Sequence, residues 1–200
     1  MKRPLLAYVV LSLVLLTALP VHADPPSDQG VLNALSTAIG HRVVKRNVAI
    51  RRSLEFPHVI SIGMYRVNHG YELTGLFVDK RYGDPRYQTR PGLASVGWKT
   101  ASASVRRTLA LAWVEKVLLA FDVFEDAPDA AFHAPHAHPF SPPVAESTAR
   151  GGVDVTMWVR EPSTSTESRT LCKWRYQFKP DGSLHAMHEI DRFTVSFSKP

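Results

Sequence analysis

The chain has 200 residues, of which 44% are hydrophobic and 21% charged, and its formal net charge is +6. This composition excludes a disordered chain, and a single cysteine, Cys172, excludes a fold held together by internal disulfides. We therefore expect a globular α+β protein that is stabilised by packing, with Cys172 as a buried and inert thiol.

The N-terminus has the three parts of a secretory signal peptide. Lys2-Arg3 is a basic start, Leu5 to Leu19 is an apolar run, and Val21-His22-Ala23 has small residues where signal peptidase cuts. The apolar run is shorter than the ~20 residues that span a bilayer. We expect cleavage after Ala23, a periplasmic or secreted location, no stable membrane span, and a single domain over residues 24–200.

The first predicted helix follows a proline-containing lead-in. Ser27 or Asp28 can cap it, because a short side-chain oxygen accepts from the free backbone N–H groups at a helix start. Apolar residues then recur at helical spacing from Val31 to Val43. This pattern predicts an N-terminal amphipathic helix that reaches about Arg46, with an extension to Arg52 as the alternative.

A β-hairpin is predicted next. Val59 to Val67 and Tyr71 to Val78 are rich in β-branched and apolar residues, and Asn68-His69-Gly70 between them favours a turn. The following stretch, Lys80 to Gly92, contains two prolines, and we interpret it as a basic, tyrosine-containing loop.

A second helix is predicted after a cap at Ser102 or Ser104. Its apolar stripe runs from Val105 to Phe124 and leaves only a narrow polar strip, so we expect a buried crossover helix that lies across a sheet. Residues 127–152 contain five prolines and three closely spaced histidines, and we expect a long irregular loop there.

The C-terminal part alternates between apolar and polar residues in three segments, which predicts an antiparallel meander. Lys179-Pro180-Asp181-Gly182 is typical of a tight turn between the last two strands. The expected register places Phe178 opposite Leu184, and Trp174 opposite His188 on the apolar face. Together with the hairpin, these strands are expected to form one five-stranded sheet packed on helices.

Positive charge is concentrated between His41 and Arg107, where thirteen Lys and Arg residues face four acids. Within this block, cations alternate with tyrosines, and both residue types can hold phosphates, carboxylates or rings. We expect the ligand-binding residues to be Arg81, Tyr82, Arg86, Tyr87 and Arg90, with a second contact pocket formed by Trp174 and His188. The alternative is that the basic block is only a solvated surface.

A different chemistry is suggested by His133, His136 and His138. In an extended segment, residues two apart point the same way and lie about 6.5 Å apart, so His136 and His138 could share a zinc or similar ion. The alternative is a proline- and histidine-rich surface loop that binds metal weakly. No nucleophile elbow, phosphate loop or dinucleotide fingerprint is present in the sequence.

These features favour an exported binding or interaction module over an enzyme. We expect it to recognise an anionic small molecule or envelope component, and to need no cofactor. Because the expected location is outside the cytoplasm, we expect no nucleic-acid partner. The second hypothesis is a metal-dependent hydrolase or metal carrier that uses the histidine-rich loop. A third is a structural envelope protein without a small ligand.

Overall fold

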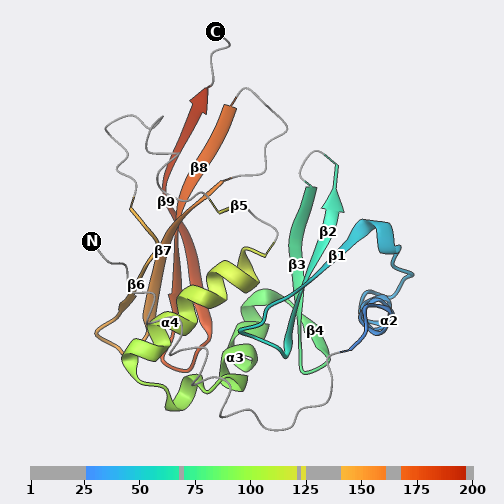
Figure 1. The fold of residues 1–200 in the computed structure, drawn as a ribbon, viewed down its shortest axis with the longest axis horizontal. Coiled ribbons are helices and arrows are strands. Elements are labelled where there is room, and N and C mark those ends of the chain that lie inside the picture. Colours follow the sequence, from blue (N-terminus) through green and yellow to red (C-terminus); the bar gives the residue numbers. More distant parts are fainter. Residues whose placement is uncertain (1–25, 68–69, 121–122, 125–140, 161–167, 197–200) are drawn as a thin grey trace.

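The computed structural model describes residues 26–67, 70–120, 123–124, 141–160 and 168–196. Over these ranges the chain is mixed α+β, with three α-helices and two antiparallel sheets (Figure 1). The prediction of one five-stranded sheet is wrong, because the strands divide between an N-terminal and a C-terminal sheet. None of the helices in the described ranges is long and apolar enough to cross a membrane.

The N-terminal sheet consists of four strands that pair in chain order. They are β1 (Val48–Arg52), β2 (Val59–Arg66), β3 (Gly70–Val78) and β4 (Arg81–Gly83). The predicted hairpin is confirmed, since β2 and β3 pair antiparallel with Tyr65 opposite Tyr71. β1 and β4 were not predicted as strands. β1 lies where the helix was expected to extend to Arg52, and β4 lies in the stretch that was expected to be a basic loop.

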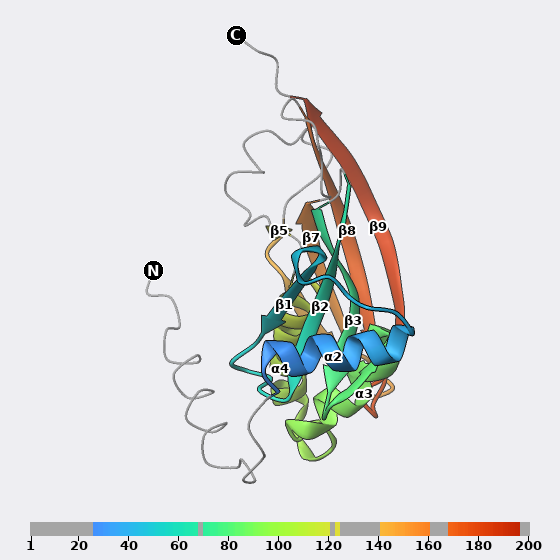
Figure 2. The same ribbon diagram turned by 90° about the vertical axis from the view of Figure 1, so that its right-hand side faces the viewer.

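The C-terminal sheet has the order β5-β7-β8-β9, and β6 also pairs with β7. Its strands are β5 (Val123–Phe124), β6 (Val144–Ser147), β7 (Val153–Arg160), β8 (Ser168–Phe178) and β9 (Leu184–Ser196). β8 and β9 are long and curved (Figure 2). The meander prediction is confirmed, but the 127–152 stretch is not irregular throughout, since β6 pairs with β7 from Val144 to Ser147.

Helix α2 (Asp28–Ile39) covers one face of the N-terminal sheet. The Ser27 hydroxyl caps it by accepting from the backbone N–H of Gly30 at 3.2 Å. Its end is earlier than predicted, because Gly40 is left-handed with φ 74° and stops the helix before Arg46. A short 3₁₀ turn, η1 (Lys45–Asn47), then leads into β1. The apolar side of α2 packs on the sheet as one cluster: Val31, Leu32, Leu35, Val48, Ile60, Ile62 and Phe77.

The opposite face of the N-terminal sheet packs on helix α4 (Ala103–Trp113) and its π-helical continuation η3 (Val114–Leu118). The same core takes in β7 and β8 of the C-terminal sheet, so α4 lies between the two sheets (Figure 1). The buried Ser61 hydroxyl donates to the Val117 carbonyl at 3.1 Å and ties β2 to η3. The prediction of a buried helix across a sheet is therefore confirmed for α4, which packs against two sheets.

Candidate functional site

The segment expected to be a loop between Lys80 and Gly92 contains a strand and a helix instead. Strand β4 ends at Gly83, and helix α3 (Pro85–Ser95) starts directly after Asp84. The Asp84 carboxylate caps α3 by accepting from the backbone N–H of Arg86 at 2.8 Å. Pro85 occupies the first helical position, where a missing N–H costs no hydrogen bond. This start gives the basic tyrosine segment a fixed shape.

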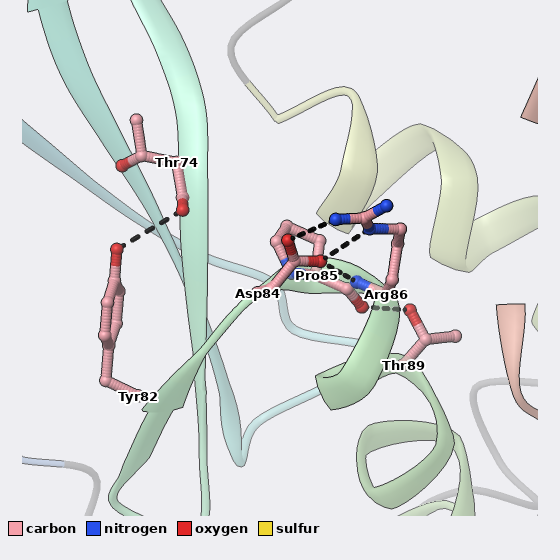
Figure 3. A network of polar contacts seen from close by, with 6 residues as sticks. All are labelled: Thr74, Tyr82, Asp84, Pro85, Arg86 and Thr89. Atoms are coloured by element: carbon pink, nitrogen blue, oxygen red, sulfur yellow. Dashed lines mark hydrogen bonds and ion pairs between the residues drawn. The ribbon is translucent and has the colours of Figure 1, made fainter.

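Two of the three predicted arginines are held by carboxylates. The Arg86 guanidinium donates to both Asp84 oxygens, from Nε at 3.1 Å and from Nη2 at 3.0 Å (Figure 3). This side-chain hydrogen bond is the main reason that the pKa of Asp84 lies below the ordinary carboxyl value. Arg90 lies 3.5 Å from Asp181, in the turn between β8 and β9, and so links α3 to the C-terminal sheet.

The Tyr82 side chain packs within the N-terminal sheet through both its hydroxyl and its ring, so we do not place it among the ligand contacts. Its hydroxyl donates to the Thr74 carbonyl at 3.3 Å (Figure 3), and its ring lies 5.2 Å from that of Phe77. The ring also covers Gly75 so closely that a Cβ there would overlap it. Tyr82 therefore packs the N-terminal sheet.

The turn between β3 and β4 has an uncommon backbone. Asp79 and Lys80 both have positive φ, at 47° and 68°, although neither is glycine. Two-residue hairpin loops with both residues left-handed usually contain Asn or Gly, because a side chain in this region costs about 1–2 kcal/mol per residue. Strained turns of this kind recur at binding sites. This one sets the positions of Asp79 and Arg81 at the end of the hairpin.

A pocket of about 510 Å³ lies between this turn and helix α3. It is lined by Val78, Asp79, Arg81, Tyr87, Gln88 and Pro91. Its volume falls within the ~300–1,000 Å³ of small-molecule sites. The pocket thus unites two of the predicted ligand residues, Arg81 and Tyr87, and leaves Tyr82, Arg86 and Arg90 outside its lining.

The pocket presents several chemical groups to a ligand. Arg81 is exposed, and among the described residues none forms a hydrogen bond or ion pair with its guanidinium. The Tyr87 side chain is 78% exposed. Pro91 has no N–H, so the Tyr87 carbonyl receives no hydrogen bond from the residue four positions later in α3. The residues that line the pocket therefore include a cation (Arg81), a carboxylate (Asp79) and an aromatic residue (Tyr87) whose backbone carbonyl lacks the usual helical hydrogen bond.

Trp174 and His188, the residues of the second predicted contact pocket, are not paired across β8 and β9. Phe178 pairs with Leu184 as expected, but register shifts in β8–β9 place His188 opposite Arg175 and Trp174 opposite Glu189. His188 is exposed, with Nε2 at 3.2 Å from Gln177 Oε1, whereas Trp174 is half-buried against the main core. The prediction that His188 lies beside Trp174 on the apolar face is wrong, because each bulge shifts the pairing by one residue.

The proposed metal ligands His133, His136 and His138 lie outside the described residues. Among the residues that the structure does describe, no group of three or more His, Cys, Asp or Glu side chains could hold a metal ion. Cys172 is fully buried, as predicted.

Three pocket residues were not predicted from the sequence. Gln88 and Pro91 were missed because no helix was predicted for this segment, and Asp79 lies in the turn before it. The signal was present in Asp84-Pro85, an N-cap residue followed by proline at the first helical position. A helix from Pro85 places Tyr87 and Pro91 on one face, four residues apart.

No family model, curated protein or solved structure matches the chain.

Proposed function

We propose that the protein is an exported binding module that takes a small anionic ligand into the pocket between the β3–β4 turn and α3. One observation carries this proposal: Arg81 lines a cavity of about 510 Å³ and no described residue takes up its charge. The neighbouring Arg86 and Arg90 are each paired with a carboxylate. Export rests on the signal-peptide pattern of residues 1–23.

Binding would combine one strong and two weaker contacts. The Arg81 guanidinium can hold a carboxylate or phosphate group through two parallel N–H bonds. The exposed Tyr87 ring offers an apolar face to the body of the ligand, and the Tyr87 carbonyl accepts from a hydroxyl or amine on it. Asp79, which also lines the pocket, repels a second negative charge and so favours ligands with a single anionic group.

The test compares two substitutions in the same turn. Arg81→Gln removes the cation that lines the pocket, whereas Lys80→Gln removes an exposed cation that does not line it. Both variants lower the net charge equally, so a difference between them reports the position of the charge. Acetate, inorganic phosphate and glycerol 3-phosphate serve as probes, titrated into isotope-labelled protein and followed by NMR at the backbone amides of residues 78–91.

We expect the parent and Lys80→Gln to bind at least one probe with shifts at the pocket residues. Arg81→Gln should weaken that binding about 10-fold or more, because a hydrogen bond to a charged group contributes about 1.5–3 kcal/mol. Equal binding by the two variants, or shifts spread over all basic surfaces, would show that the basic block is only a solvated face.

A further inference from the structure

The free end of the β2–β3 hairpin carries apolar and aromatic side chains on its surface. Val67 is 77% exposed, Tyr65 53% and Tyr71 37%. The two tyrosine rings pack edge to face, with centroids 5.5 Å apart and planes at 67°. This end of the hairpin projects on the side of the molecule opposite to α3 (Figure 1). An exposed group of this kind, on a protruding end, is a surface to which a partner can bind.

Cations surround these side chains. The Tyr71 hydroxyl donates to the Arg46 carbonyl at 3.1 Å, which holds η1 against the hairpin end. Lys45 and Arg46 of η1 are exposed, and no described residue pairs with their side chains. Arg66 is also exposed and forms an ion pair with Glu72 at 3.0 Å. We call this surface the hairpin tip: Lys45, Arg46, Tyr65, Arg66, Val67 and Tyr71.

We propose that the hairpin tip docks on the surface of an anionic phospholipid bilayer. Tyrosine favours the membrane interface because its ring is apolar and its hydroxyl polar, and lysine and arginine side chains reach from there to lipid phosphates. The hairpin tip combines exposed apolar and aromatic side chains with more cations than carboxylates. This combination complements a negatively charged bilayer.

The proposed membrane contact is independent of the ligand pocket. β3 begins at Gly70 beside the tip and ends at Val78, which lines the pocket, so the two sites lie at opposite ends of the N-terminal sheet. A protein held to a bilayer by its tip keeps the pocket turned away from the lipid. Either proposal can therefore fail without affecting the other.

A fluorescent probe at the tip tests the contact directly. Cys172 is the only cysteine and is fully buried, so a thiol introduced by Val67→Cys takes up a polarity-sensitive dye selectively. Leu54→Cys is the matched control, because Leu54 is 97% exposed and follows the far end of β1. Protein recovered after export is mixed with vesicles of phosphatidylglycerol and phosphatidylcholine, or of phosphatidylcholine alone.

We expect the dye at residue 67 to shift to the blue only with vesicles that contain phosphatidylglycerol, and the dye at residue 54 to stay in water. Because the readout is local, a retained signal peptide cannot produce this difference. A dye at residue 67 that stays in water with both kinds of vesicle overturns the proposal, as does an equal shift at residues 67 and 54.

Paired charge variants test the role of the cations. Lys45→Gln with Arg46→Gln should weaken binding to the anionic vesicles about 30-fold, since each cation near such a surface contributes about one kcal/mol. The control, Lys99→Gln with Lys179→Gln, removes two exposed cations that flank the hydrogen bond between Trp98 and Pro180, in the segments after α3 and after β8, and should change binding little. An equal loss in both pairs would show general attraction by net charge and would refute docking through the tip.

Discussion

Gly92 of helix α3 packs against Trp113 of α4, and replacing Gly92 tests how the helix that lines the pocket is held in place. A Cβ at Gly92 would overlap the six-membered ring of Trp113. This ring cannot give way easily, because Trp113 is fully buried, donates to Thr89 Oγ1 at 3.2 Å, and packs edge-on against Phe56 at 5.0 Å. Gly92→Ala should therefore destabilise the protein, although alanine is the better helix former.

The size of the effect follows from the contacts at stake. If the Trp113 ring moves, the protein loses a hydrogen bond of about 1 kcal/mol and an aromatic contact of similar strength. If the ring stays, overpacking costs about 1–3 kcal/mol. Alanine recovers about 1 kcal/mol through helix propensity. We expect a net loss of about 1 kcal/mol, and at most about 2 kcal/mol, which lowers Tm by up to about 8 °C.

Thermal unfolding followed by circular dichroism measures this change, and Gly30→Ala in α2 is the control. The nearest atoms to a Cβ at Gly30 are Ser27 Oγ at 3.5 Å and Pro26 Cβ at 3.6 Å, which are ordinary contacts. Gly30→Ala should raise stability by about 0.5–1 kcal/mol. A Tm of Gly92→Ala at or above that of the parent would refute the close packing of α3 on Trp113.

Two further predictions concern the start of α3 and the strand before it. The lowered pKa of Asp84, caused first by its hydrogen bond to Arg86, adds stability above the ordinary carboxyl pKa that is lost as pH falls through the lowered value. Asp84→Asn keeps a capping side chain but should flatten the acid limb of a Tm-against-pH curve, and an unchanged limb would contradict this. Tyr82→Phe should lower stability by about 0.5–1.5 kcal/mol through loss of the Thr74 hydrogen bond and leave probe binding by NMR unchanged. Weaker probe binding by Tyr82→Phe would show that the Tyr82 hydroxyl contributes to the ligand site.

Local patterns in the sequence predicted the elements better than their assembly. The β2–β3 hairpin, the buried helix and the meander each follow from periodicity and turn residues within a short window. Which strands share a sheet depends on distant packing, such as the core that α4 forms with both sheets. The pattern fixes which face of a strand is apolar but not its partner, so it could not separate two sheets from one.

The errors at the candidate site have similarly specific causes. The register prediction failed at Trp174 because the shifts in β8–β9 leave no mark in the alternation of residues. The charge pattern led to Arg81, but it could not show that Arg90 pairs with Asp181, which lies far away in the sequence. Gly92 and Pro91 suggested a loop, whereas tertiary packing against Trp113 favours the helix.

The order of strands in the sheets has a consequence for how the chain folds. β1 to β4 pair in sequence order, and so do β7, β8 and β9. Each pairing joins neighbours along the chain, so loop-closure entropy is small and each sheet can form quickly. The contacts of α4 with both sheets, like those of α3 with β9, join segments that are far apart in the sequence. Joining the two preformed halves around α4 is therefore expected to be the slow step of folding, and substitutions in that core should affect the folding rate most.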